Sequence, residues 1–363
     1  MTNPQAHNFS RRDLARLALG AAAMASTSAA KPLTPWGPGI KISLQMPNSY
    51  DDDYLTFANQ MGVEYVSIGG RNTTYEYFAG HKKRVEAAGL KIANMGDTSV
   101  HNMPEVTLGL PGRDEKIAEY IRYLQNIGKA GIHYTTYAHM GNGIWSSERE
   151  TTRGGASARA FHQSTAKGHW AGEVYESPLS HGRKFSKEEL WDNWEYFIKR
   201  VAPVAEDVGV RIGVHPDDPP VPELGGVPRH MFGTFDGYVR AFEIANSPNV
   251  GICLCCGTWM EGGAHTGKNV LDAAREFAKM DKLWKIHFRN VTGPIPNFVE
   301  TYVDDGYTDM KQLMRTLVDV DFRGILIADH VPTMVGDRKT GWAFSIGYIR
   351  ALYDMAKEER GRA

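Results

Sequence analysis

From residue 40 onward, short β-type runs alternate eight times with helix-type segments. Each run is rich in apolar and β-branched residues, whereas the segment after it repeats its apolar residues at helical spacing. The β-type runs are residues 41–46, 64–70, 91–97, 133–140, 210–216, 249–257, 283–290 and 324–330. Eight strand–helix units in 363 residues predict an α/β fold, a (β/α)8 TIM barrel, and we expect one domain over residues 40–358.

A doubly wound open sheet is the alternative fold for the same alternation. Such sheets usually carry a Gly-rich phosphate-binding loop after the first strand, and no such loop follows residues 41–46. The barrel is therefore the favoured prediction. In a barrel, the functional groups lie at the C-terminal ends of the strands.

One stretch, residues 141–186, interrupts the alternation with a long irregular segment. An insertion of this length in a compact domain is usually a lid or a binding loop. Its content of Arg, Lys, His, Ser and Gly suits an anionic, hydroxylated substrate. A solvated excursion is the alternative, and both interpretations stay open at this point.

The N-terminal residues 1–30 resemble an export signal. Arg11 and Arg12 precede an apolar, Ala-rich stretch that ends in the small residues Ser28-Ala29-Ala30. The paired arginines resemble those of a twin-arginine signal, which predicts a periplasmic protein that is exported after folding. A short amphipathic helix is the alternative, and the protein would then be cytoplasmic.

Composition argues against several classes of partner. The chain is 42% hydrophobic and 23% charged and has a formal net charge of −1, which disfavours nucleic-acid binding and a polybasic membrane surface. Beyond the N-terminal segment, no apolar run is long enough to span a bilayer. All three cysteines lie within residues 252–256, so they cannot form a long-range disulfide and are core residues or a ligand.

Four residues with metal-binding side chains stand at the ends of four successive predicted strands: His215, Cys255, His287 and Asp329. Side chains alternate faces along a strand, so these four converge if each points into the barrel mouth. Alone, a strand histidine is more often structural and a buried cysteine more often a small hydrophobe. Nitrogen, sulfur and oxygen donors at consecutive strand ends nevertheless predict a divalent metal site.

The motifs around these residues resemble those of the mannonate dehydratase family. The matching stretches are HPDDPP (215–220), LCCGT (254–258), HFRN (287–290), DM (309–310) and ADH (328–330). The resemblance covers roughly residues 40–355. It implies a barrel of the xylose-isomerase type that removes water from D-mannonate to give 2-keto-3-deoxy-D-gluconate. It also implies that His215, Cys255, His287 and Asp329 hold Mn²⁺, with Fe²⁺ as the alternative.

The chain departs from this family around the expected substrate. The histidine of the family's Phe-His-Glu segment is absent from Phe298-Val299-Glu300, and the arginine of its Arg-Pro-Asp-His-Gly run is absent from residues 327–331. Trp342 stands where the family has a tyrosine, and residues 41–50 lack the family's Arg-containing motif. The expected metal ligands are thus retained, whereas the expected substrate contacts differ.

Arg289 is the first candidate for a substrate contact. It shares a strand face with His287, and its guanidinium could bind a substrate carboxylate as a fork. The alternative is an ion pair with Asp217 or Glu300 that closes the rim of the barrel. We include Arg289 among both the catalytic and the substrate-binding candidates.

The reaction also needs a general acid and a general base. Candidates are His330, which follows the last metal ligand, and Asp217 or Asp218 in the loop after the first metal histidine. For Asp217 we prefer a role in orienting that histidine. His139 and Tyr307 are weaker candidates, which we assign to substrate binding.

Two other functions use the same features. A metal-dependent isomerase or epimerase would need the same barrel and metal but would return the proton instead of eliminating water. An exported sugar-acid binding protein without turnover is the third interpretation, suggested by the altered substrate contacts. In each case we expect a small sugar acid or sugar as the partner, no nucleic acid, and possible homo-oligomers.

Overall fold

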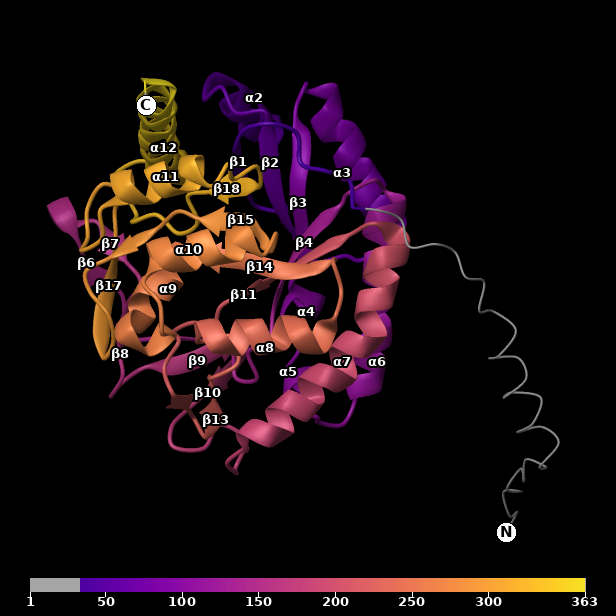
Figure 1. Cartoon of the computed structure of the whole chain (residues 1–363). Coiled ribbons are helices and arrows are strands. Elements are labelled where there is room, and N and C mark those ends of the chain that lie inside the picture. The colour runs from indigo at the N-terminus through magenta and orange to yellow at the C-terminus, as the bar shows by residue number, and fades with distance from the viewer. Residues whose placement is uncertain (1–32, 363) are drawn as a thin grey trace, which may run out of the picture.

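The computed structural model describes residues 33–362, so the predicted export signal in residues 1–30 lies outside the described residues. Eight parallel strands form one sheet in the order β3-β2-β1-β18-β15-β14-β11-β4 (Figure 1). They are β1 (Lys41–Met46), β2 (Tyr65–Gly70), β3 (Lys91–Asp97), β4 (Tyr134–Ala138), β11 (Arg211–His215), β14 (Val250–Cys255), β15 (Leu283–His287) and β18 (Ile325–Ile327). An isolated parallel bridge between Asn102 and Ala138 joins the two ends of this sheet. The predicted (β/α)8 barrel is confirmed, and the open-sheet alternative is wrong.

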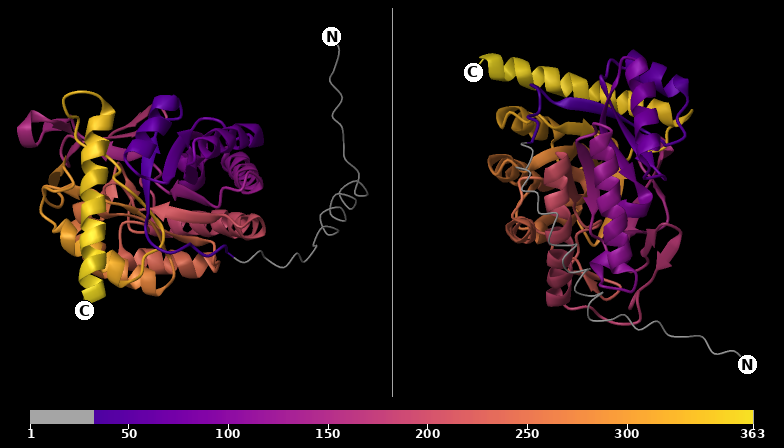
Figure 2. Two further views of the ribbon diagram at one scale, coloured as in Figure 1. Left: turned by 90° about the horizontal axis from the view of Figure 1, so that it is seen from above. Right: turned by 90° about the vertical axis from the view of Figure 1, so that its right-hand side faces the viewer.

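Helices surround the strands (Figure 1). The longer ones are α2 (Asp52–Gln60), α3 (Tyr75–Ala87), α6 (Arg113–Lys129), α7 (Lys187–Val208), α8 (Phe235–Ala245), α10 (Val270–Lys279), α11 (Met310–Asp319) and α12 (Arg338–Arg362). Short helices α4 (Thr98–His101), α5 (Pro104–Thr107) and α9 (Cys256–Gly262) directly follow strands or loops at the barrel mouth. The C-terminal helix α12 lies along the outside of the barrel beside α11 (Figure 2).

Local signals in the sequence explain where these helices begin and end. The hydroxyl of Ser186 accepts from the backbone N–H of Glu189, and the Glu189 carboxylate accepts from the N–H of Ser186, which forms a capping box before α7. At the other end of α7, Gly209 takes a left-handed conformation with φ 68° that residues with a Cβ adopt less readily. The chain then enters β11 directly, so the cap helps to place the strand that ends in His215.

The insertion at residues 141–186 is built from short strands, so it is more regular than we expected. They are β5 (Ile144–Ser146), β6 (Glu150–Thr151), β7 (Ser157–Ala158), β8 (Ala160–His162), β9 (Lys167–Trp170) and β10 (Glu173–Tyr175), with the 3-10 turn Arg153–Gly155. β5, β9 and β10 form one antiparallel sheet. β8 pairs with β17 (Asn297–Thr301), which pairs with β16 (Asn290–Val291). The insertion is thereby joined to the loop that follows β15.

A continuous apolar core lies between the barrel and its helices. Between α6, α7 and β4 it contains Tyr120, Tyr137, Trp194 and Phe197, which are fully or almost fully buried. A core of this extent keeps the strand ends in fixed relative positions. Among the described helices, none combines the length and the apolar character needed to cross a membrane.

Candidate metal centre and active site

Three of the predicted metal ligands converge at the C-terminal mouth of the barrel. His215, Cys255 and His287 are the last residues of β11, β14 and β15, and Cys255 is in register with His287. One ligand atom from each lies within 4.8 Å of the other two, and all three residues are buried. Because these strands are adjacent and parallel, their last inward-facing side chains meet at one edge of the sheet.

The ring atoms of the two histidines suit a divalent cation. The Nδ1 of His215 lies 2.7 Å from the carbonyl oxygen of Pro216, a bond that leaves Nε2 as the metal-binding atom. The Nδ1 of His287 is buried and makes no hydrogen bond among the described residues, although Oδ1 of Asp329 lies 3.3 Å from it, and its Nε2 lies 3.3 Å from Sγ of Cys253. Imidazole nitrogen and thiolate sulfur are common ligands of divalent transition metals, so the donors present fit such an ion.

Three hydrogen-bond donors surround the sulfur of Cys255. The backbone N–H and the hydroxyl of Thr258 lie 3.5 Å and 3.2 Å from Sγ, and Nη2 of Arg289 lies 3.4 Å from it. Burial raises the pKa of the Cys255 thiol well above its usual value, whereas the Arg289 guanidinium lowers it. A bound cation would add the positive charge that favours the thiolate. The surroundings of the sulfur therefore also fit a metal ligand.

Asp329, the fourth predicted ligand, lies against this group from beyond the end of its strand. Its Oδ1 is 3.3 Å from Nδ1 of His287, and its Oδ2 is 3.6 Å from Sγ of Cys255. β18 ends at Ile327, and Asp329 has a left-handed backbone with φ 59°. Its side chain still lines the same cavity as Ile327, two residues earlier, as the alternation along the strand predicts. A carboxylate that contacts two members of the group can serve as the fourth ligand.

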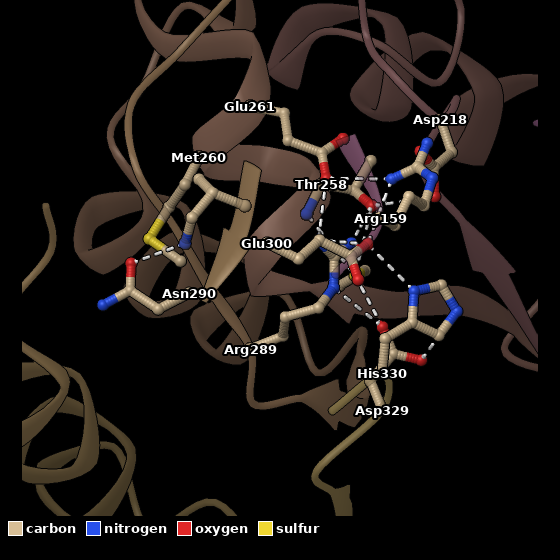
Figure 3. A network of polar contacts seen from close by, with 12 residues as sticks. Arg159, Asp218, Thr258, Met260, Glu261, Arg289, Asn290, Glu300, Asp329 and His330 are labelled. Carbon is tan, nitrogen blue, oxygen red and sulfur yellow. Dashed lines mark hydrogen bonds and ion pairs between the residues drawn. The ribbon is translucent and has the colours of Figure 1, made fainter. Parts of the chain in front are cut away.

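Arg289 is at the centre of a buried network of ion pairs (Figure 3). Its Nη1 lies 2.7 Å from Glu261 and 3.1 Å from Glu300, and its Nε lies 3.0 Å from Oδ2 of Asp329. Its Nη2 donates to the hydroxyl of Thr258 at 3.0 Å. The side chain is 0% exposed and all three of its nitrogens contact groups of its own chain, so the predicted fork to a substrate carboxylate is wrong. The alternative pairing with Glu300 is the one that forms.

A second arginine, Arg159, enters this network from the insertion (Figure 3). Its Nη2 lies 2.5 Å from Oδ1 of Asp218, and its Nη1 lies 3.1 Å from Glu300 and 3.4 Å from Glu261. The two guanidinium groups offset the charge of carboxylates that would otherwise be buried without partners. We did not predict Arg159 or Glu261, because no motif or periodic pattern around them indicates an inward position.

Replacing Arg289 should strongly destabilise the fold. In Arg289→Met the carboxylates of the network would stay buried with one guanidinium fewer, and breaking a buried ion pair costs about 3–5 kcal/mol. We expect a decrease of that size in the free energy of unfolding measured by urea denaturation. Arg323→Met, which removes an exposed pair with Asp321, should change it by less than about 1 kcal/mol. Equally small decreases in the free energy of unfolding of both variants would contradict a stabilising role for Arg289.

His330 lies between the network and the metal ligands, and it lines two neighbouring cavities. Its Nδ1–H donates to Oε1 of Glu300 at 2.9 Å, and 44% of its side chain is exposed. The carboxylates of Asp329 and Glu300 raise the pKa of His330 to about 9. The hydrogen bond to Glu300 holds the ring in one orientation, whereas Nε2 makes no hydrogen bond among the described residues and has Oδ1 of Asp329 4.0 Å away.

The first cavity has a volume of about 240 Å³ and opens beside the metal ligands. His215, His287 and Asp329 form part of its wall together with Asp218 and His330. Polar side chains from β1, β2, β3, β4 and β15 also line it, namely Gln45, Ser67, Asn94, Asp97, Thr136 and Lys285. A cavity with this many hydrogen-bonding groups suits a ligand that carries several hydroxyl groups.

Two predicted substrate contacts lie elsewhere. His139 is buried in the aromatic core, where its Nδ1 is 2.8 Å from the hydroxyl of Tyr137 and its ring packs on Trp194. Thr136 lines the cavity and therefore faces inward. His139 is three residues further along, so alternation of side chains turns it outward. Tyr307 donates its hydroxyl to the carbonyl oxygen of Met260 at 2.6 Å and lines a different cavity. Both assignments to substrate binding are wrong.

Asp217 also does not take the position that we expected. It is buried, it lines neither of the two cavities beside the metal ligands, and burial raises its pKa to about 6. The ring of His215 bonds to the carbonyl of Pro216, so Asp217 is not the group that orients it. The neighbouring Asp218 does line the cavity, but its carboxylate pairs with Arg159. Of the acid–base candidates, His330 is therefore the one that lines the cavity with a ring nitrogen that makes no hydrogen bond among the described residues.

Comparisons with known proteins point to one family. The family model for D-mannonate dehydratase (UxuA) matches residues 68–360. The mannonate dehydratase of Streptococcus equi subsp. zooepidemicus is 33% identical over 292 residues, which are 75% of this chain and 78% of that protein. The mannonate dehydratase of Streptococcus pneumoniae is 32% identical over 292 residues, or 75% of this chain and 77% of that protein.

Solved structures agree with the sequence matches. The mannonate dehydratase from Streptococcus suis serotype 2 superposes with a TM-score of 0.77 at 27% identity and covers 90% of this chain and 95% of its own. A xylose isomerase domain protein from Planctomyces limnophilus, with a TM-score of 0.59 at 14% identity over 91% of this chain and 100% of its own, shares the fold. The chain belongs to the mannonate dehydratase family of hydro-lyases, which is built on a barrel of the xylose-isomerase type.

Proposed function

We propose that the chain removes water from D-mannonate, or from a closely related sugar acid, in a reaction that depends on a divalent metal. The observation that carries this proposal is the group His215, Cys255 and His287, with Asp329 against it, on the wall of a polar cavity. Relatives that cover most of the chain are named for this activity. Mn²⁺ is the metal that we propose, with Fe²⁺ as the alternative.

The reaction breaks the C2–H and C3–O bonds of the sugar acid, releases water and leaves an enol that becomes the 2-keto-3-deoxy product. His215, Cys255, His287 and Asp329 would hold the divalent cation, which would supply positive charge to stabilise the negative charge that develops on the substrate as its weakly acidic proton leaves. His330 is the group that we propose for proton transfer, because it lines the cavity, Glu300 holds its Nδ1 and no described group forms a hydrogen bond with its Nε2. The ring can hold or accept a proton at Nε2 without losing its orientation.

The product identifies the reaction. Metal-loaded protein is incubated with D-mannonate and with other aldonic acids, and the products are analysed by mass spectrometry. Loss of one water and formation of 2-keto-3-deoxy-D-gluconate would support the proposal. A product of unchanged mass would indicate an isomerase or epimerase instead. Binding of the acids without any turnover would indicate a binding protein.

We also propose that the insertion at residues 141–186 is a lid over the cavity. It contributes Ile144 and Trp170 to the cavity wall and Arg159 to the ion-pair network. The ring of Trp170 stacks on His101, with centroids 5.6 Å apart and an angle of 30° between the planes. Contacts of this kind join the insertion to the barrel mouth and exclude water from the cavity.

Replacing Trp170 with a smaller residue tests whether the insertion acts as a lid over the cavity. Trp170→Ala removes the ring that covers the cavity and packs on His101, so we expect an increase in KM for D-mannonate of about 10-fold. Val174→Ala, which shortens an exposed side chain on the adjacent strand β10, is the matched control and should leave KM unchanged. Steady-state kinetics separates the two variants. An unchanged KM in Trp170→Ala would show that the insertion does not close over the substrate.

Export to the periplasm and homo-oligomer formation stay predictions. Export rests on residues 1–30 alone, in which two arginines precede an Ala-rich apolar stretch. The N-terminal residue of the protein isolated from its own cells distinguishes a processed from an unprocessed chain.

A further inference from the structure

Lys285 is a buried cation that lines the cavity below the metal ligands. It precedes His287 by two residues in β15, so the two side chains project from the same face of the strand. The residue is 3% exposed. The interior of such barrels is usually filled by branched apolar side chains, and a lysine at this level is therefore unusual.

The ammonium group of Lys285 has few partners in its own chain. Its Nζ donates to the hydroxyl of Thr136 at 3.3 Å and lies 6.0 Å from the centroid of the Tyr134 ring, and no carboxylate of the described residues forms an ion pair with it. By contrast, the buried Arg159 and Arg289 pair with several carboxylates, and the buried Lys41 donates to three backbone carbonyls. An ammonium has three donors, and burying it without a counter-charge is unfavourable. The surroundings of Lys285 thus leave room for an anionic group.

The other groups around this part of the cavity suit hydroxyls. Ser67, Asn94 and Thr136 are uncharged, and they reach the cavity from β2, β3 and β4. Oδ2 of Asp97 is buried at the cavity and has no hydrogen-bond partner among the described residues. Apart from the metal-binding group, Asp218 and His330, the lining therefore combines one buried ammonium with neutral groups and a carboxylate oxygen that makes no hydrogen bond. This pattern matches a ligand with one anionic end and a chain of hydroxyl groups.

We propose that Lys285 binds the carboxylate of the sugar acid and so selects acids over neutral sugars and polyols. The inference deepens the proposed function, on which it rests for the class of ligand. Arg289, the residue that the sequence suggested for this contact, has its donors occupied by Glu261, Glu300 and Asp329. Lys285 faces the same cavity as the metal ligands and has donors to spare. A carboxylate beside it would satisfy the ammonium and fix the orientation of the hydroxyl chain.

The test compares an acid with its neutral counterpart. D-Mannonate and D-mannitol have the same carbon skeleton, but only the first has a carboxylate. Binding of both is measured by calorimetry with Mn²⁺ present, in a His330→Asn background that slows consumption of the acid. Lys285→Met should weaken D-mannonate binding by about 10- to 100-fold and change D-mannitol binding by less than about 2-fold. Lys41→Met, a buried lysine outside this cavity, is the control and should change neither.

Several outcomes would overturn the inference. Equal weakening of both ligands would show that Lys285 only supports the shape of the cavity, and unchanged D-mannonate binding would show no contact at all. The inference would also be rejected if Lys285→Met lost its bound metal. It would be rejected as well if the protein with Lys285 intact bound neither D-mannonate nor D-mannitol. Lys285→Gln, which keeps a polar end, should reproduce the loss of D-mannonate affinity if Met at this position impairs folding. Lys285-dependent binding without formation of a 2-keto-3-deoxy product would reject the proposed reaction and leave this inference standing.

Discussion

Cys255→Ala and His287→Ala are expected to retain less than a tenth of the wild-type metal and to lose dehydratase activity by at least about 10³-fold. Each variant removes one of the three side chains whose ligand atoms lie within 4.8 Å of one another. The remaining donors would still be buried but too few to hold a divalent cation tightly. Without the cation, the charge that develops on the substrate would lose its main stabilising partner. Metal content per chain and the rate of product formation are measured on the same samples.

Cys256→Ala is the matched control for this prediction. Cys256 is adjacent in the sequence and equally buried, but its Sγ lies near the carbonyl oxygen of Leu254 and not among the grouped ligand atoms. We expect this variant to keep its metal and its activity. Equal loss of metal in Cys255→Ala and Cys256→Ala would point to a general disturbance of the core and against a ligand role for Cys255.

His330→Asn is expected to lower kcat by about 10²- to 10⁴-fold with little change in metal content. The amide can still donate to Glu300 in place of Nδ1–H, but it cannot take up or release a proton as an imidazole does. A large decrease in kcat with bound metal therefore separates proton transfer from metal binding. Single-turnover measurements show whether the chemical step is the one that slows.

His162→Asn is the control for His330. His162 also pairs with a carboxylate, that of Glu150, but it lies on the insertion and lines neither cavity beside the metal ligands. Its replacement should leave kcat unchanged. If His330→Asn kept wild-type kcat, or if it lost its metal, the proposed role in proton transfer would be rejected.

The strands and the four proposed ligand positions could be predicted from the sequence because they depend on local patterns. Each buried strand is a short apolar run, and the residue type at its C-terminal end is readable directly. Parallel neighbours then bring His215, Cys255 and His287 together without further information. Asp329 lies two residues beyond the end of β18 and has a left-handed backbone, but it lines the same cavity as Ile327, as alternation predicts.

The substrate contacts were harder to predict, because they depend on which partners other parts of the chain supply. Nothing near Arg289 in the sequence indicates that Glu261 in α9 and Arg159 in the insertion belong to the same buried network. His139 follows β4 directly, and only the alternation from Thr136 shows that it turns outward into the core. Lys285 stands on the predicted inward face, but its lack of an acidic partner is a property of the folded chain.

A metal titration tests whether the protein removes water from D-mannonate in a reaction that depends on a bound metal ion. Wild-type protein is freed of metal with a chelator, Mn²⁺ is added back in steps with D-mannonate present, and the product is followed by mass spectrometry. We expect no turnover without metal, a rate that saturates at about one metal ion per chain, and a product that has lost one water. Dehydration that proceeds equally well in the metal-free protein, or a metal-dependent product of unchanged mass, would contradict this expectation.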